Sequence, residues 1–148
     1  MKKNRLMIAA ASLFVVLFLS SCKDEYTKIS FTDLPYESQV FLNTHFPNEV
    51  VSHIMKDSEI FDKSYEVFFT DGDNVEFNST GFWENVDCHN DSVPSSVLGY
   101  EISDYINTHH SGSYAVEIDV NMLNYDVELN NGLELVFDSY FDFVRYED

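Results

Sequence analysis

Strict alternation of apolar and polar residues is the clearest pattern along this chain. Over residues 116–121, Val116, Ile118 and Val120 alternate with two acids and an asparagine, the pattern of a strand with one buried and one solvated face. Alternation resumes over residues 125–130. In the same way, strands are predicted earlier in the chain over residues 50–55, 64–69, 73–78 and 82–86.

Two stretches show helical spacing instead, and proline or glycine marks their ends. The first predicted helix has Pro35 in its first turn and ends at Pro47, whereas the second begins near Pro94 and is closed by Gly112. The apolar stripes that would pack on the sheet are Val40, Phe41 and Phe46 in the first helix and Val97, Leu98, Ile102, Tyr105 and Ile106 in the second.

The chain also contains an internal repeat. Tyr-Glu-Val at residues 65–67 returns as Tyr-Asp-Val at residues 125–127, and the helical residues 41–45 return with small changes as residues 105–109. We therefore predict an α+β fold built as a tandem repeat, in which each copy is one helix followed by a four-stranded antiparallel sheet. The copies would cover about residues 32–88 and 93–147. The offset of 60 between the two Tyr-acid-Val motifs also relates Gly72 to Gly132, Phe77 to Phe137 and Ser79 to Ser139, whereas the two helical segments are offset by 64.

Each copy contains a hairpin whose register can be predicted. A two-residue loop would place Val67 opposite Glu76 and would put acids on the buried face. A three-residue loop, Thr70-Asp71-Gly72, instead places Val67 opposite Val75, and the second copy agrees. Such a loop ends on a glycine in the left-handed region, so we predict positive φ at both turn glycines. These structural turn residues are Gly72 and Gly132.

The acids around this turn also suggest the start of a calcium-binding loop. An EF-hand needs further oxygen ligands at the fifth and twelfth positions, which here are Val75 and Phe82. An EF-hand starting at Asp71 is therefore excluded. A weak surface cation site stays open, because the chain is so rich in carboxylates.

The N-terminus resembles a bacterial lipoprotein signal. A short basic region precedes an apolar run, residues 6–19, which is too short for a permanent membrane span. The run closes on Leu19-Ser20-Ser21-Cys22, and Cys22 would be lipidated after removal of a signal peptide, residues 1–21. An ordinary secretion signal with a chance cysteine is the alternative.

The residues after the cysteine predict a place in the envelope. Lys23, Asp24 and Glu25 are similar to the short signal that sends some lipoproteins to the outer face of the outer membrane. We expect a flexible tether over residues 22–31, followed by a domain over residues 32–148. The predicted localisation is the outer membrane, lipid-anchored, on the cell surface or the periplasmic face. The membrane, through acyl chains on Cys22, is then the first partner.

Net charge limits the classes of other partner that the protein is expected to bind. Removing the signal takes away three of the eight basic residues and none of the 26 acids, which leaves 5 basic and 26 acidic residues and a formal charge of −21. Such a charge argues against binding nucleic acid or anionic lipid through charge. It fits a basic protein partner, a cation or plain solubility outside the cell.

The reactive residues form no recognisable catalytic arrangement. Cys88 and His89 have no further Cys or His at metal-ligand spacing, and we expect a partly buried, inert thiol. His45 and His109 end the predicted helices, where a cation suits the helix dipole. A metal site from His109 and His110 is disfavoured, because neighbouring side chains in a helix point apart. We find no nucleophile-and-base set, and we predict no enzyme activity, no metal and no cofactor.

Aromatic side chains are the most suggestive functional feature. They make up 16% of the chain, and most are expected to fill the core. Any that gather on the solvated face of a sheet would mark a surface that binds an unknown protein partner. The candidates are Phe68, Phe82, Trp83 and Tyr140.

Several of these motifs together resemble the PepSY-like, beta-lactamase-inhibitor-like periplasmic domain family. The likeness covers about residues 32–147, although Phe141 and Phe143 replace a glycine and a tryptophan in the second copy. It implies helices packed on antiparallel sheets in tandem, as in beta-lactamase inhibitory protein, and it carries over no inhibitor contact residue. The motifs are Leu34-Pro35, Phe46-Pro47, Tyr65-Glu66-Val67, Asp71-Gly72 and the run from Phe77 to Trp83.

Two classes of function remain open. The first is a surface lipoprotein with a non-catalytic domain that binds or inhibits a protein through its sheet face. The alternative is a small-ligand or cation-binding accessory protein of the envelope. A concave acidic pocket would favour this alternative.

Overall fold

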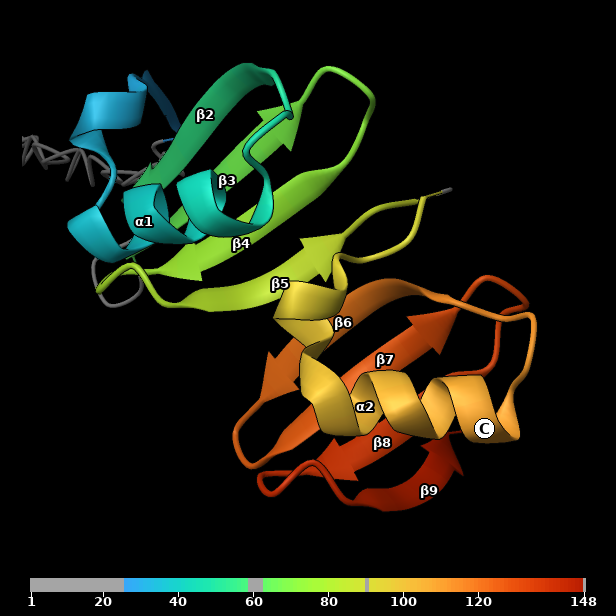
Figure 1. Cartoon of the computed structure of the whole chain (residues 1–148). Coiled ribbons are helices and arrows are strands. Elements are labelled where there is room, and N and C mark those ends of the chain that lie inside the picture. Colours follow the sequence, from blue (N-terminus) through green and yellow to red (C-terminus); the bar gives the residue numbers. More distant parts are fainter. Residues whose placement is uncertain (1–25, 59–62, 90, 148) are drawn as a thin grey trace, which may run out of the picture.

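A computed structural model describes residues 26–58, 63–89 and 91–147 (Figure 1). None of the helices in these residues is long and apolar enough to cross a membrane. The predicted signal peptide and Cys22, Lys23, Asp24 and Glu25 lie outside the described residues. In chain order the elements are β1 (Thr27–Ile29), the 3-10 helix η1 (Phe31–Asp33), α1 (Tyr36–His45), β2 (Val51–Ser58), β3 (Lys63–Phe69), β4 (Asn74–Asn78), β5 (Trp83–Asp87), α2 (Ser95–His109), β6 (Ala115–Asn121), β7 (Asn124–Leu129), β8 (Glu134–Asp138) and β9 (Phe143–Glu147).

These strands form a single antiparallel sheet of nine strands, in the order β1 to β9. The predicted α+β tandem repeat, with two four-stranded sheets as in beta-lactamase inhibitory protein, is therefore wrong. The joining pair is β5 and β6, which lie on either side of α2 in the chain and pair through Val86 and Ile118. A sequence repeat shows which segments are alike, but it does not show which strand edges meet. Pairing β5 with β6 leaves no open edge in the middle of the molecule, where unpaired N–H and C=O groups would stand exposed.

The first strand lies within the segment that was predicted as a tether. Thr27–Ile29 form the edge strand β1, which pairs antiparallel to β2 over the partners Ile54, Met55 and Lys56. The sheet thus begins before the predicted boundary at residue 32.

Both predicted hairpin registers are confirmed. Val67 lies opposite Val75 between β3 and β4, and Val127 lies opposite Leu135 between β7 and β8. The closing backbone hydrogen bond of the first hairpin runs from Phe69 N–H to the Asp73 carbonyl, which leaves three residues in the loop. The two turn glycines adopt φ of 109° and 77°, in the left-handed region that favours glycine. They are Gly72 and Gly132.

Both helices lie on the same face of the sheet and bury it (Figure 1). The largest side chains that are fully buried are Phe77 in β4 and Phe137 in β8. The ring of Phe41 from α1 meets Phe77 edge-on with centroids 5.6 Å apart, and Tyr105 from α2 meets Phe137 at 5.4 Å. One cluster of buried apolar residues runs under both helices, so the core is continuous.

The turn between β4 and β5 packs tightly against the start of α1. Gly81 adopts φ 91° in this turn, and its carbonyl oxygen accepts a hydrogen bond from Ser38 Oγ at 3.2 Å. A Cβ at this position would stand 2.6 Å from the Cβ of Pro35. Glycine is therefore what allows the turn to hold the first turn of α1 against the sheet.

Candidate functional site

Carboxylates line the face of the sheet that the helices leave open. Successive side chains in a strand point to opposite faces, so residues next to the buried Val67, Val75 and Val127 project from this open face. Strand pairing arranges them in two rows across the sheet, here called the carboxylate rows. One row is Glu66, Glu76, Asn85, Asp119 and Asp126, and the other is Asn74, Asp87, Glu117, Glu128 and Glu134.

Like charges stand directly opposite each other in these rows. Glu66 faces Glu76, and Glu117 stands between Asp87 and Glu128 on its two neighbouring strands. Opposed like charges destabilise a sheet, because the Cβ atoms of facing residues are only about 5 Å apart. The open face thus carries an arrangement that folding alone does not favour.

The pKa values of these carboxyls reflect the crowding. Partial burial raises the pKa of Glu66, and the charge of Glu76 raises it further. Burial is also the main cause that raises the pKa of Glu117. The Asn85 amide opposes this by donating to Glu117 Oε1 at 2.7 Å and to Asp119 Oδ1 at 2.9 Å. The folded state holds these protons more tightly than the unfolded chain does. The free energy of unfolding that these groups contribute therefore increases as the pH falls from neutral toward their raised pKa values.

In the described residues, the ion pairs of this face lie at its rim. Arg145 Nη2 contacts Glu147 Oε2 at 2.9 Å on the edge strand β9. His89 Nδ1 lies 2.7 Å from Asp87 Oδ1, and this hydrogen bond raises the pKa of His89. The centre is a shallow hollow of about 200 Å³ lined by Glu117, Asp119, Asp126, Val127, Glu128 and Glu134.

A second acidic region lies at the C-terminal end of α1, beside the β3–β4 turn. Glu49, Asp71, Asp73 and Asp91 line a cavity of about 300 Å³ there. A hydrogen bond between Glu49 and Asp71 raises the pKa of Glu49 and lowers that of Asp71, as expected for two carboxyls that share a proton. We call this cavity the acidic pocket.

The floor of the acidic pocket is the pair Asp73 and Cys88, both buried. Burial raises the pKa of Asp73, and burial together with the charge of Asp73 raises the pKa of the Cys88 thiol. Cys88 therefore stays protonated and inert. In the described residues, no group of three or more His, Cys, Asp or Glu side chains is arranged to hold a metal ion.

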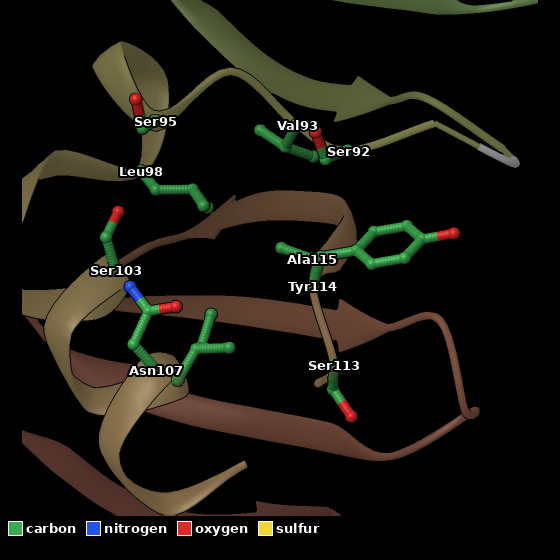
Figure 2. A pocket seen from close by; sticks show the side chains of 10 residues that line it. Ser92, Val93, Ser95, Leu98, Ser103, Asn107, Ser113, Tyr114 and Ala115 are labelled. Carbon is green, nitrogen blue, oxygen red and sulfur yellow. The ribbon is translucent and has the colours of Figure 1, made fainter. Parts of the chain in front are cut away.

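A third cavity, of about 240 Å³, lies between α2 and the start of β6 (Figure 2). Its hydroxyl groups come from four serines and Tyr114, but its lining contains no histidine and no carboxylate that could act as a base. Ser103 Oγ donates a hydrogen bond to the Gly99 carbonyl at 2.6 Å, which occupies its proton. This cavity provides no nucleophile-and-base set.

The predicted aromatic candidates lie at three different places. Phe68 lies on the open face opposite Asn74, at the end of the second carboxylate row, and its ring stacks on His53 with centroids 4.4 Å apart. Phe82 and Trp83 line an apolar groove of about 390 Å³ against α1. Tyr140 is exposed in the turn between β8 and β9. The structure thus brings Phe82 and Trp83 together and leaves Phe68 apart from them.

Comparison with known proteins identifies a family but no established activity. A family model described as "Putative beta-lactamase-inhibitor-like, PepSY-like" matches residues 63–145. No functionally curated protein matches the chain.

Solved structures of similar proteins agree with the fold. A Bacteroides vulgatus ATCC 8482 protein, described as a putative periplasmic protein from the DUF2874 family, is 34% identical with a TM-score of 0.78, over 84% of this chain and 98% of that one. A Bacteroides thetaiotaomicron protein, described as a putative calcium-regulated periplasmic protein, is 34% identical with a TM-score of 0.79, over 83% of this chain and 97% of that one. A further Bacteroides vulgatus ATCC 8482 protein, a putative periplasmic protein of unknown function, is 33% identical with a TM-score of 0.77, over 84% of this chain and 100% of that one. The solved relatives are thus described as periplasmic, and none is described as an enzyme.

Proposed function

The chain belongs to the PepSY-like, beta-lactamase-inhibitor-like family, and we propose that it is a non-catalytic binding protein of the bacterial envelope. Its binding surface is the open face of the sheet, and its partner is a protein that presents Lys and Arg side chains. The observation that carries this proposal is the pair of carboxylate rows. Folding keeps like charges opposed there, and a cationic partner removes the resulting repulsion on binding.

The chemistry of the open face supports this choice of partner. The face is broad and has only a shallow hollow at its centre, which suits a protein surface better than a small ligand. Burial is the main cause that raises the pKa values of Glu66, Glu76 and Glu117, and neighbouring acids raise them further, an effect that a positively charged partner would offset. Negative potential also speeds the encounter with a basic protein.

The proposed place of this binding protein is the outer membrane. We propose that Cys22 is lipidated and that Lys23-Asp24-Glu25 direct the protein to the outer face, as the N-terminal motif predicts. The description of the solved relatives as periplasmic supports export into the envelope.

Capture of partners from envelope and secreted fractions, with the chain from Cys22 onward immobilised, tests the binding proposal. We expect a basic protein to be retained and to elute as salt is raised, because the attraction is between charges. The variant Glu117→Gln/Glu128→Gln should bind it about tenfold more weakly, which corresponds to about 1.4 kcal/mol.

The matched control for this experiment is Glu37→Gln/Glu101→Gln, which removes the same charge from exposed positions on the two helices. This control should bind like the parent protein. The proposal is wrong if both double variants lose the partner equally, or if the retained protein is not basic.

A second candidate function, cation binding, is favoured by the acidic pocket. The pocket is concave and brings four carboxylates together, and oxygen ligands of this kind suit Ca²⁺. One solved relative is described as calcium-regulated. Because the carboxylates are not arranged as a ligand set in the described residues, Ca²⁺ would have to draw them closer together on binding.

Thermal unfolding with and without CaCl₂ tests this second function. Ca²⁺ at about a hundred times its Kd should stabilise the domain by about 2.7 kcal/mol. Asp71→Asn/Asp91→Asn should abolish the increase in Tm, whereas Asp126→Asn/Glu134→Gln on the open face should keep it. An equal increase in both variants would show that Ca²⁺ acts through general charge screening.

A further inference from the structure

The two ends of the sheet differ sharply in the side chains at their turns. The β4–β5, β6–β7 and β8–β9 turns all lie at one end, which is on the left in Figure 1. Large apolar residues stand exposed at these turns: Phe82 at 62%, Met122 at 97%, Leu123 at 74% and Tyr140 at 81%. We call this the apolar end. Isolated exposed apolar residues are common, but their gathering at three successive turns calls for an explanation.

The opposite end of the sheet has polar turns. The β3–β4 turn there consists of Thr70, Asp71 and Gly72, and the β7–β8 turn consists of Asn130, Asn131 and Gly132. The acidic pocket lies at this end as well. Hairpin turns generally favour small polar residues and glycine of this kind. The exposed apolar residues in the turns of the apolar end are therefore not explained by the needs of turn formation.

The N-terminal segment enters the fold at the apolar end. Thr27 in β1 pairs with Lys56, close to the end of β2 and beside the start of β3. Cys22 precedes Tyr26 by four residues, which span at most about 14 Å when fully extended. A lipid on Cys22 would therefore hold the apolar end close to the bilayer.

Basic residues gather at the same end. The described chain has four, of which Lys28, Lys56 and Lys63 lie on β1, β2 and β3 near this end, together with Asp57. The carboxylate of Asp138 beside Tyr140 is held in the turn, where its Oδ1 accepts backbone hydrogen bonds from Tyr140 at 2.9 Å and Asp142 at 3.0 Å. Aromatic and lysine side chains are the groups that settle at the headgroup level of a membrane.

We propose that the apolar end is a membrane-docking surface, with Phe82, Met122, Leu123 and Tyr140 seated in the headgroup region of the bilayer that holds the Cys22 lipid. This inference rests on the proposed lipid anchor. Docking complements the anchor, because exposed apolar side chains leave water when the tips enter the interface. In this orientation the strands run away from the membrane surface. The open face is then accessible from the side, and the acidic pocket lies at the end of the domain farthest from the membrane.

Trp83, the single tryptophan of the chain, is a natural probe of docking because it follows Phe82 directly. The solved relatives consist almost wholly of this domain, so it folds without the N-terminal segment. The chain from Cys22 onward can be coupled through this cysteine to a maleimide lipid in vesicles of phosphatidylethanolamine and phosphatidylglycerol, because Cys88 is buried. A fraction of the lipids in these vesicles carries a nitroxide quencher on the acyl chain, close to the headgroup.

We expect these quencher lipids to remove most of the Trp83 emission. The variant Leu123→Ser/Tyr140→Ser, which leaves the surroundings of Trp83 unchanged in sequence, should recover the emission. Val50→Ser/Tyr114→Ser removes one aliphatic and one aromatic residue away from the apolar end and should be quenched like the parent chain.

Unquenched Trp83 in the parent chain, or equal quenching in both double variants, would overturn the docking proposal. Chemical coupling makes this result independent of natural lipidation. Flotation of the native full-length protein with membranes, compared with Cys22→Ser, tests the anchor alone. A protein that floats without quenching would refute docking and leave the anchor intact.

Discussion

Phe137→Ala should lower the free energy of unfolding by about 3–5 kcal/mol, the usual range for emptying a fully buried phenylalanine site. Phe137 has no exposed surface, and its ring meets those of Tyr105 and Phe143 edge-on at 5.4 and 5.9 Å. Because one sheet and one core run through the domain, the loss should shift the unfolding of the whole domain in one step. Urea titration followed by circular dichroism measures the effect.

Fluorescence of Trp83 makes this experiment a test of the single sheet. Trp83 begins β5, whereas Phe137 lies three strands away in β8. In Phe137→Ala, fluorescence and circular dichroism should report the same lowered midpoint. A fluorescence midpoint that stays at the parent value would mean that the β2–β5 part unfolds by itself. If the alanine variant does not fold, the milder variant Phe137→Leu allows the same comparison of the fluorescence and circular dichroism midpoints.

Gly81→Ala should destabilise the domain by about 3 kcal/mol, which combines about 1 kcal/mol for a non-glycine residue at positive φ with about 2 kcal/mol for overpacking. The new Cβ would lie 2.6 Å from Pro35 Cβ and 2.9 Å from Ser38 Oγ. Neither neighbour can yield easily, since Pro35 is a rigid ring at the start of α1 and Ser38 is buried. Thermal or urea unfolding measures the loss.

Gly72→Ala is the matched control for this prediction. Gly72 also has positive φ, at 109°, but a Cβ there would meet nothing within 4 Å. It should lose only about 1 kcal/mol, which isolates the backbone strain. Equal losses in the two variants would show that the contact between the β4–β5 turn and α1 contributes nothing of its own.

Local features of the fold were predictable from the sequence. The register at Val67 and Val75 followed from alternation, because a slip of one residue would have buried Glu76. The helix starts at Pro35 and Pro94 were likewise visible. Such features depend on neighbours within a few residues, where the pattern of side chains leaves few solutions.

Long-range pairing was not predictable in this way. Asn85 and Asp119 are partners across β5 and β6 although 34 residues and the whole of α2 separate them. The acids of each strand were visible singly, but only the pairing of neighbouring strands turns them into the carboxylate rows. For the same reason, the sequence suggested one aromatic patch, whereas strand order sends Phe68 to the open face and Phe82 and Tyr140 to the turns of one end.

The shortest strand of the sheet, β1, determines how much of the N-terminal chain is free to extend from the domain. β1 adds only the three residues Thr27–Ile29 to the edge, while Leu34 is the first residue that is buried in the core. If β1 separates from β2, the eight residues from Thr27 to Leu34 become slack, which adds up to about 28 Å of extended chain. In the proposed lipid-anchored protein, the pairing of β1 with β2 therefore keeps the domain close to the membrane, and release of β1 would let the domain extend outward.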